Sequence, residues 1–306
     1  MSTRHTGSNT ARTSSKPLRR TVLEVPGNVQ RMLDKATGLS VDVLVFDLED
    51  SVPDTIQHKA EARSLISEVL ERADIAAREI GVRINAPDTK HYADDIAWLN
   101  DKKLDLVFLP KVSSESVYAE VEAEIDRTGI DATTGIALIV EHPGALEDLG
   151  DIARKANRLS MLVAGGFDYT LECGSNALNA MAGLGGLLSD GHLTYMRQRV
   201  VAVARARGLT PIDGILVAKP KDNERVRAAA DRSRQNGFEG CMVFYPPMLE
   251  AVDAAFTPTN QEEAWARRVI AAHADAVEAG RGAFVLDGVA MLAHHVTVAK
   301  QILGED

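Results

Sequence analysis

Short apolar segments alternate with longer amphipathic segments along most of this chain of 306 residues. The apolar segments are rich in Val, Ile and Leu, a pattern typical of strands that are buried on both faces of a parallel sheet. Apolar residues between them recur at the helical spacing, which predicts helices that cover the sheet. The predicted strands are residues 21–26, 41–50, 80–85, 104–112, 135–141, 159–168, 211–215 and 240–245. The predicted helices are residues 28–36, 56–73, 92–100, 115–127, 145–156, 193–207 and 223–236.

Eight successive strand–helix units predict an α/β fold, the (β/α)₈ TIM barrel, over residues 19–258. A doubly wound sheet is the alternative, because the order of strands in a sheet cannot be derived from this pattern. One insert, residues 174–191, is rich in Gly, Ala, Ser and Leu. We interpret this insert as a loop with a short helix and as a candidate subunit contact.

The two ends of the chain differ from the barrel segment. Residues 1–18 are rich in Ser, Thr, Arg and Lys and lack the apolar core of a secretory signal. They are expected to form a disordered tail, with a transit peptide as the alternative. Residues 259–306 predict a C-terminal helical extension, with helices over 262–279 and 291–303 and a Gly-rich turn between them. This extension is expected to pack on the barrel or on an adjacent subunit.

Composition and charge limit the class of protein. The net charge of −10 disfavours nucleic acid as a partner, because binding to phosphates needs a basic face. No apolar run approaches the roughly 20 residues that a membrane helix needs. The two cysteines, Cys173 and Cys241, offer no disulfide framework and fit a reducing compartment. We therefore expect a cytoplasmic protein that acts on small molecules.

Polar residues follow the apolar run in five consecutive predicted strands. In chain order they are Asp47, Glu49 and Asp50, then Arg83 and Asn85, then Lys111, Glu141 and Asp168. A single polar residue in such a place usually caps a helix or lies in a solvated turn. The carboxyl ends of the strands of a barrel, however, converge on one mouth, where residues distant in sequence become neighbours. The series therefore predicts a shared functional site at that mouth.

The residue types in this series favour a particular chemistry. Oxygen ligands without Cys or paired His favour a hard divalent cation, Mg²⁺ or Mn²⁺, over zinc. Glu141 and Asp168 are the best ligand pair, because each ends an apolar strand alone. Glu49 and Asp50 would then orient metal-bound water, and the fork of Arg83 suits a carboxylate or a developing enolate. Such an ion would chelate a 2-oxo acid and act as a Lewis acid.

The histidines offer no metal-ligand spacing. His142 follows Glu141 directly and is a candidate for contact with the site. His294 and His295 are adjacent on a predicted helix, where neighbouring side chains point apart, so we expect a surface or packing role for them. No nucleotide-binding glycine motif is present: the GLGG segment at 183–186 is not followed by Lys.

With these residues in view, the chain resembles the citrate lyase β-subunit-like (CitE-like) family of the HpcH/HpaI aldolase superfamily. The resemblance extends from about Arg19 to Leu303. Its motifs occur in the family order, and the whole ordered series is more specific for the family than any single motif. They include VPGN at 25–28, VFDLEDSV at 45–52, VRIN at 82–85, LPKV at 109–112, IVEHPGAL at 139–146 and AGGFDY at 164–169.

The resemblance implies an enzyme that makes or breaks carbon–carbon bonds in acyl-CoA substrates such as citryl-, malyl- or citramalyl-CoA. It implies Mg²⁺ at Glu141 and Asp168, with Arg83 at the substrate. Lys111 and Asn28, from the LPKV and VPGN motifs, are the further candidates for substrate binding, together with Glu141. Coenzyme A would enter as part of the substrate. Members of the family are commonly homotrimers or built from trimers, and their C-terminal segment helps to close the site, often on an adjacent subunit.

Three positions depart from the family pattern. Where family members carry DGxMID, this chain has DGVAML, so that Leu292 replaces the acid/base Asp and only Asp287 remains. Tyr245 replaces the His of the IHPxQ element, and Phe167 replaces a frequent acidic residue. Because leucine cannot transfer a proton, the proton-transfer group is unassigned. A site lined by Phe167, Tyr245 and Leu292 would favour a bulkier or less polar substrate than glyoxylate.

Three functions are consistent with these observations. The first is a Mg²⁺-dependent lyase, or the reverse synthase, that cleaves a 3-hydroxyacyl-CoA into an acyl-CoA and a 2-oxo acid. The second is a metal-dependent aldolase that acts on free hydroxy-oxo acids without CoA. The third is a non-catalytic family member that binds Mg²⁺ but has lost its base.

Overall fold

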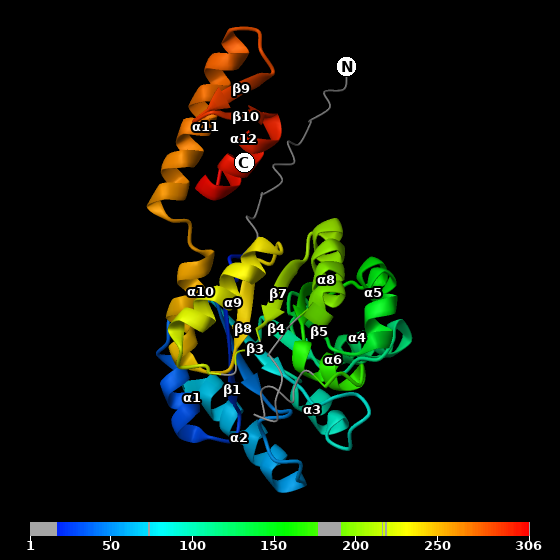
Figure 1. The fold of residues 1–306 in the computed structure, drawn as a ribbon. Coiled ribbons are helices and arrows are strands. Elements are labelled where there is room, and N and C mark those ends of the chain that lie inside the picture. Colours follow the sequence, from blue (N-terminus) through cyan, green and yellow to red (C-terminus); the bar gives the residue numbers. More distant parts are fainter. Residues whose placement is uncertain (1–16, 73, 177–190, 216, 218, 306) are drawn as a thin grey trace, which may run out of the picture.

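The computed structural model describes residues 17–72, 74–176, 191–215, 217 and 219–305. Eight parallel strands close into a barrel in sequence order, and β8 pairs with β1. The strands are β1 (Thr21–Pro26), β2 (Val43–Asp47), β3 (Glu79–Arg83), β4 (Leu106–Leu109), β5 (Gly135–Val140), β6 (Leu159–Ala164), β7 (Thr210–Gly214) and β8 (Gly240–Val243). The predicted (β/α)₈ barrel is confirmed, and the doubly wound alternative is wrong because β1 and β8 are hydrogen-bonded neighbours (Figure 1).

Helices surround the outside of this barrel (Figure 1). They are α1 (Gln30–Thr37), α2 (Ile56–Arg72), α3 (Tyr92–Trp98), α4 (Glu115–Asp126), α5 (Pro143–Lys155), α6 (Gly166–Glu172), α8 (Thr194–Arg207), α9 (Asn223–Gln235) and α10 (Leu249–Phe256). The sixth strand ends earlier than predicted, because Gly166 already begins α6. Most of the predicted insert lies outside the described residues.

Two apolar layers form the core of the barrel. Alternate strand residues point inward and fill the barrel, and their interior cluster includes Val22, Val43, Val45, Phe108, Ile139 and Val163. The other strand residues pack outward against the helices in a second, larger cluster. Toward the carboxyl ends the inward positions become polar, since Glu24 follows Val22 and Asp47 follows Val45 in the same alternation. The polar mouth is therefore a continuation of the barrel interior.

The C-terminal extension contains a β-hairpin that the sequence pattern did not predict. Between α11 (Asn260–Glu278) and α12 (Ala293–Leu303), β9 (Ala283–Leu286) pairs antiparallel with β10 (Val289–Leu292). The two residues that join these strands, Asp287 and Gly288, have φ values of 53° and 79°. Positive φ at both central residues is typical of the type I′ hairpin turn, for which Asp-Gly is a favoured pair. The expected Gly-rich turn is therefore a hairpin.

The extension has its own small core and begins at the amino-terminal end of the barrel. Ala266, Val269, Phe284 and Met291 are among the residues of this core. Arg20, which precedes β1, donates a hydrogen bond to Thr257 Oγ1 at 2.9 Å, so the chain leaves the barrel at that end. Figure 1 shows α11, the hairpin and α12 standing together beyond the barrel. Within the described part of the chain, no helix is long and apolar enough to cross a membrane.

Candidate active site

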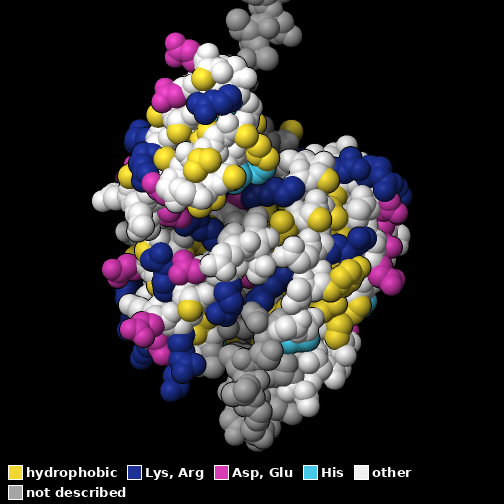
Figure 2. All heavy atoms as spheres, turned by 45° about the horizontal axis from the view of Figure 1, so that its top comes forward, with side chains coloured by type: hydrophobic (Ala, Val, Ile, Leu, Met, Phe, Trp, Pro, Cys, Tyr) yellow, Lys and Arg dark blue, Asp and Glu magenta, His cyan; other side chains and the backbone are white. Residues whose placement is uncertain are grey.

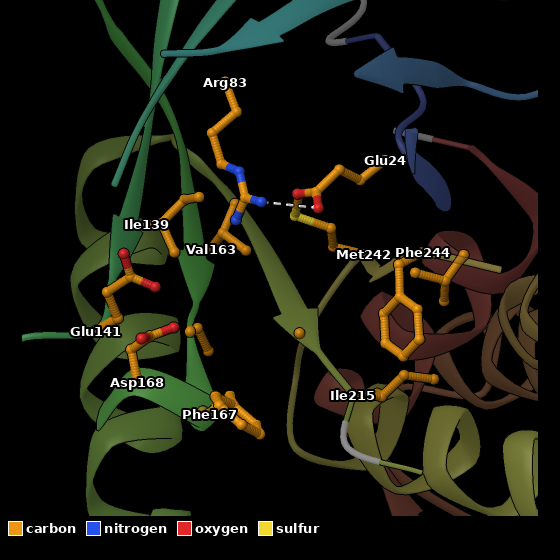
Figure 3. Close-up of a pocket in the computed structure, with 15 residues that line it drawn as sticks. Glu24, Arg83, Ile139, Glu141, Val163, Phe167, Asp168, Ile215, Met242 and Phe244 are labelled. Atoms are coloured by element: carbon orange, nitrogen blue, oxygen red, sulfur yellow. Dashed lines mark hydrogen bonds and ion pairs between the residues drawn. The ribbon is translucent and has the colours of Figure 1, made fainter. Parts of the chain in front are cut away.

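A cavity of about 150 Å³ opens at the carboxyl ends of the strands (Figure 3). Its apolar wall includes Ile139, Val163, Phe167, Ile215, Met242 and Phe244. The ionisable residues that line it are Glu24, Arg83, Glu141 and Asp168. These four residues come from β1, from β3, from the end of β5 and from α6. The convergence of distant strand ends on one mouth, predicted from the sequence, therefore holds for Arg83, Glu141 and Asp168.

Glu141 and Asp168 lie next to each other at this mouth (Figure 3). Glu141 follows the last residue of β5 and is 4% exposed, whereas Asp168 is half-buried in the first turn of α6. Gly165 makes this approach possible, since a Cβ atom there would lie 2.8 Å from Glu141 Oε2. The backbone N–H of Lys111 donates to Glu141 Oε1 at 2.7 Å and fixes that carboxylate.

The electrostatics of this pair fit a bound cation. Burial, followed by repulsion from Asp168 and Glu49, raises the pKa of Glu141 to about 8. Burial also raises the pKa of Asp168, an effect that Lys111 opposes. Two neighbouring carboxylates with raised pKa values would be stabilised as anions by a divalent cation between them.

The number of protein ligands also fits magnesium. Among the described residues, no group of three His, Cys, Asp or Glu side chains is placed to hold a metal ion. Mg²⁺ is commonly bound through one or two carboxylates and completes its coordination with water and substrate oxygens. Glu141 and Asp168 therefore suffice as the contribution of the protein to such a site.

Arg83 lies among three carboxylates. Its Nε and Nη2 donate to the two oxygens of Asp47 at 2.6 and 2.8 Å, and Nη2 also donates to Glu24 Oε1 at 2.9 Å. Nη1 lies 3.2 Å from Glu49 Oε2 and makes no hydrogen bond within the described residues. One arm of the guanidinium is thus fixed by Asp47, while Nη1 keeps N–H donors for a ligand.

Asp47 and Glu24 respond differently to the same arginine. Asp47 is fully buried, and burial alone would raise its pKa, but Arg83 and hydrogen bonds from Ser51 and the Glu49 N–H hold that pKa below its usual value. For Glu24 burial is stronger than the attraction of Arg83, and the nearby anions Asp47, Glu49 and Asp50 add to it, so its pKa rises to about 8. The two carboxyl groups therefore differ in charge near neutral pH.

Lys111 connects the two sides of the mouth. Its Nζ pairs with Glu49 and lies 2.9 Å from both oxygens of Asp50. Its backbone adopts a φ of 52°, which is uncommon for a residue with a Cβ atom and is often found at functional sites. In this conformation the same residue presents its N–H to Glu141 and its ammonium group to Glu49. The predicted neighbours Glu49, Asp50 and Lys111 are thus brought together.

Asn85, by contrast, does not reach the mouth, and its expected place in the site is wrong. It is buried between β3 and α3, where its Nδ2 donates to Leu48 O and to Asp95 Oδ2 at 2.9 and 2.6 Å. It lies two positions after Arg83, beyond the end of β3, where the alternation of a strand no longer holds, and its backbone N–H also donates to Asp95 Oδ2 of α3 at 2.8 Å. Asn85 therefore supports the loop after β2 from outside the barrel.

His142 lies at the edge of the site, and Asn28 lies in the turn after β1. The Oδ1 atom of Asn28 is buried and has no hydrogen-bond partner within the described residues, as is expected of an atom that binds a ligand or water. His142 accepts a hydrogen bond from the Gly144 N–H at 3.0 Å and caps α5. It also lines a second cavity of about 430 Å³, which shares Glu141 and Asp168 with the first.

His294 and His295 belong to the extension. Their rings lie 4.2 Å apart between centroids, so the expectation that they point apart is wrong. The reason is that His295 turns toward the start of α12, where its Nδ1 accepts a hydrogen bond from the Leu292 N–H at 3.1 Å. Both residues lie outside the barrel mouth of their own chain.

Of the three departures from the family pattern, only Phe167 lines the cavity. Tyr245 turns outward toward α1, because the inward positions of this strand are Met242 and Phe244. Leu292 lies at the end of the hairpin in the extension. Within this chain the apolar lining therefore consists of Phe167, Met242 and Phe244, and Tyr245 does not contribute to it.

Glu24 is the lining residue that the sequence interpretation missed. The predicted site residues all follow an apolar run, whereas Glu24 lies inside the segment TVLEVP. A charged residue within an otherwise apolar strand, two positions after the inward-facing Val22, was the available signal.

Comparisons with known proteins agree with this geometry. The model of the HpcH/HpaI aldolase/citrate lyase family matches residues 20–246. The (3S)-malyl-CoA thioesterase of Cereibacter sphaeroides is 34% identical over 290 residues, which cover 94% of each chain. The citrate lyase subunit beta of Leuconostoc mesenteroides is 30% identical over 283 residues, which cover 90% of this chain and 89% of that one.

Solved structures show the same fold. CitE from Mycobacterium tuberculosis, in complex with magnesium, acetoacetate and coenzyme A, superposes with a TM-score of 0.76 at 24% identity, covering 94% of this chain and 98% of that one. A citrate lyase from Burkholderia xenovorans superposes with a TM-score of 0.77 at 22% identity, covering 94% and 93%. Aldolases and citrate lyases are carbon–carbon lyases, so the expected enzyme class is confirmed. The chain belongs to the HpcH/HpaI aldolase/citrate lyase family.

Proposed function

We propose that this protein is a Mg²⁺-dependent carbon–carbon lyase, or the reverse synthase, that acts on a 3-hydroxyacyl-CoA related to citryl-, malyl- or citramalyl-CoA. The products are an acyl-CoA and a 2-oxo acid. The observation that carries this proposal is the pair Glu141 and Asp168 beside Arg83 in one cavity. The C. sphaeroides malyl-CoA relatives and the CitE complex with magnesium and coenzyme A support the same substrate class.

Glu141 and Asp168 would hold Mg²⁺, or Mn²⁺ with the same oxygen ligands. When bound, the ion supplies a Lewis acid for the carbonyl and carboxylate oxygens of the 2-oxo acid. Arg83 Nη1 offers N–H donors to a negative oxygen of the substrate. Glu49 and Asp50 hold Lys111 in place and, in this proposal, orient water around the ion.

A groove beside the cavity supports coenzyme A as part of the substrate. It has a volume of about 460 Å³ and shares Phe244 with the cavity. Arg31 and Lys35 of α1 line it together with Tyr245 and Pro246, which follow β8. Cations beside an apolar and aromatic surface suit a chain that ends in phosphates and a purine base. Asn28 lies in the turn between β1 and α1 and belongs to this proposed substrate surface.

We propose further that residues 259–306 act on a neighbouring subunit of a homotrimer or a multiple of trimers. The extension leaves its own barrel at the amino-terminal end, opposite the mouth, so it does not cover its own site. Its exposed large hydrophobic side chains include Val277, Val285, Val289, Leu292 and Val298. Figure 2 shows apolar side chains on the face of the extension that is turned forward. Such a surface is suited to burial against a second copy.

We place the protein in the cytoplasm, where Cys173 and Cys241 would remain thiols, as both are here.

The apolar wall supports a substrate that is bulkier or less polar than glyoxylate. Phe167 is 47% exposed and Phe244 is 61% exposed, and both line the cavity together with Met242. An alkyl group on the substrate would cover these side chains and gain roughly 25 cal/mol per Å² of buried apolar area. Equal kcat/KM values for glyoxylate and for larger 2-oxo acids would contradict this preference.

A screen of acyl-CoA and 2-oxo acid pairs by mass spectrometry, with Mg²⁺ and with EDTA, tests the proposed reaction. We expect at least one pair to condense to a 3-hydroxyacyl-CoA only when Mg²⁺ is present. Asp168→Asn should fail to form this product. No product from any pair, while Mg²⁺ still binds, would favour a non-catalytic member instead.

Product analysis and CoA titration distinguish two other activities from the proposed lyase reaction. The identity to a (3S)-malyl-CoA thioesterase favours thioester hydrolysis as a second candidate. A hydrolase would convert malyl-CoA into free malate and CoA, whereas a lyase would release acetyl-CoA and glyoxylate. Isothermal titration with CoA addresses the free-acid aldolase, since absence of binding at millimolar CoA would favour an enzyme that does not use the thioester.

A further inference from the structure

Glu24 is a buried carboxyl group in the wall of the cavity. It points inward from β1, its side chain is 13% exposed, and it lies 2.9 Å from Arg83 Nη2. Val22 and Val43, the inward residues below it, belong to the apolar interior of the barrel. A carboxyl group at the top of an apolar interior is expensive to bury, and such groups are common where proton transfer occurs.

The proposed reaction needs a group that moves a proton at carbon. When the carbon–carbon bond of a 3-hydroxyacyl-CoA breaks, its electron pair remains with the acyl-CoA as an enolate. The α-carbon must then receive a proton. The ionisable side chains that line the cavity are Glu24, Arg83, Glu141 and Asp168. Arginine does not give up its proton in proteins, and the last two are assigned here to the metal.

We propose that Glu24 is the acid/base group of this reaction, an inference that rests on the proposed lyase function. In the cleavage direction, the O–H bond of the hydroxyl breaks and its proton passes to water as the 2-oxo acid forms. Glu24 gives its carboxyl proton to the α-carbon of the enolate and regains a proton from water. In the condensation direction, the Glu24 carboxylate takes the α-proton of the acyl-CoA. No other reactant is needed.

The position of Glu24 suits this role. Figure 3 shows Glu24 and Arg83 in one part of the cavity and the pair Glu141 and Asp168 in another. A substrate bound between them would place its 2-oxo acid part at the metal ligands and its acyl part at Glu24. Arg83 contacts Glu24 directly and is therefore in reach of an enolate oxygen beside the carbon that Glu24 protonates.

The surroundings of Glu24 also keep it protonated near neutral pH. Burial is the largest cause, and Asp47 on β2 and Glu49 and Asp50 in the following loop add to it, while Arg83 on β3 opposes it. The resulting pKa of about 8 lies close to neutral pH. A group with such a pKa exchanges protons in both directions most efficiently.

Hydrogen–deuterium exchange at the α-carbon isolates this step. The wild type, Glu24→Gln and Glu24→Asp are incubated in D₂O with Mg²⁺, pyruvate or glyoxylate, and either acetyl-CoA or propionyl-CoA. Deuterium in the recovered acyl-CoA is measured by mass spectrometry. We expect Glu24→Gln to lose at least about a hundredfold in exchange rate, the usual contribution of an acid/base group, and Glu24→Asp to regain part of it. The wild-type rate should rise through about pH 8 and then level off, and Glu24→Gln should lack this rise.

Glu79→Gln is the matched control. Glu79 belongs to β3, as Arg83 does, but it lies at the amino-terminal end of the barrel, away from the cavity. Its Oε2 pairs with Arg19 Nε at 2.6 Å. This variant should exchange at the wild-type rate. Circular dichroism and Mg²⁺ titration show whether each variant keeps its fold and metal site.

The outcomes separate this inference from the function on which it rests. Exchange by Glu24→Gln at the wild-type rate, with an unchanged pH profile, would overturn the role of Glu24 and leave the lyase function standing. A loss that is equal in Glu24→Gln and Glu79→Gln would show a structural effect and also overturn it. A wild type without exchange or product for any tested pair would overturn the lyase function and this inference together.

Discussion

At the scale of single residues, Arg83 shows how one cation gives several carboxylates different properties. Asp47 is fixed by two hydrogen bonds from the guanidinium and stays ionised, whereas Glu24 receives one and has a raised pKa. These differences depend on distances that no sequence pattern contains. The residue types at the strand ends predicted Arg83, Glu141 and Asp168 at the mouth, because strand polarity alone decides which ends meet. Glu24 was missed because the alternation of inward and outward positions had not been applied to its strand, and Asn85 was misjudged because it lies past the end of β3, where Asp95 of α3 and Leu48 O hold it.

Asp168→Asn tests the metal pair. The variant should lose Mg²⁺-dependent activity by at least a hundredfold, since metal catalysis supplies several kcal/mol and about 1.4 kcal/mol corresponds to a factor of ten. Without metal it should be at least as thermostable as the wild type, because it removes a repulsion next to Glu141. Asp151→Asn, at an exposed position on α5, is the control for activity. Full activity of Asp168→Asn would show that this residue is not a ligand.

Glu24→Gln should change how stability depends on pH. The pKa of Glu24 is about 8 in the folded protein and near 4.5 when unfolded, so the folded state holds the extra proton between these values. Stability therefore falls as pH rises through this window, by at most about 1.4 kcal/mol per pH unit for one group. Relative to the wild type, the variant should be more stable at pH 8 than at pH 5. Denaturant unfolding in EDTA at both values measures this, and an unchanged difference would contradict it.

At the scale of elements, the loop between β2 and α2 shows how a functional segment is held. Lys59 of α2 is buried, and its Nζ donates to Leu48 O and Glu49 O at 2.7 and 2.8 Å. Burial lowers the pKa of Lys59, against the attraction of Asp47 and Glu49. Two backbone carbonyls of the loop that carries Glu49 and Asp50 are thereby fixed from behind. The periodic pattern predicted α2 as a surface helix, but it could not show that the lysine of this helix points into the protein.

Lys59→Met is expected to destabilise the protein and to weaken the site through this loop. It removes one of the two hydrogen bonds that each carbonyl accepts, leaving Asn85 Nδ2 on Leu48 O and the Val52 N–H on Glu49 O, at a cost of roughly 1–3 kcal/mol in total in the free energy of unfolding. Urea unfolding measures this loss. Lys155→Met, at a lysine that is 58% exposed, should stay within about 0.5 kcal/mol of the wild type. Equal effects of the two substitutions would contradict the assigned role of Lys59.

The hairpin of the extension marks the limit of prediction at this scale. Helical periodicity was clear in α11 and α12, but β9 and β10 are only four residues long each. Their apolar residues were assigned to a turn and to the start of a helix. The pair Asp287 and Gly288 was the available signal, because both central residues of a type I′ turn require positive φ. The family motif drew attention to Asp287 as a chemical group, whereas Arg268 pairs with it in the turn.

At the scale of the whole molecule, the barrel could be predicted because the same unit repeats eight times and each repeat adds its own signal. The orientation of the extension could not be predicted, since it depends on the conformation of the short connection between α10 and α11. That connection leaves residues 260–303 at the end opposite the mouth. The site of one chain therefore lacks the cover that its own extension would give, and a neighbouring chain is the proposed source.

Analytical ultracentrifugation tests this arrangement. A chain of 33.0 kDa should sediment as a trimer or as a multiple of trimers. Val285→Asp and Val289→Asp, on the exposed face of the hairpin, should shift the population toward smaller species and lower the activity, because each places a charge in the proposed contact. An active monomer, unaffected by these substitutions, would contradict the arrangement.

The central claim is that Glu141 and Asp168 together hold a magnesium ion, and a crystal structure with Mg²⁺ tests it most directly. The account predicts one ion at the mouth with an oxygen of each carboxylate about 2.0–2.1 Å from it, water completing the coordination and Arg83 nearby. An ion bound elsewhere, or the two carboxylates turned apart beyond the reach of a single ion, would contradict the account.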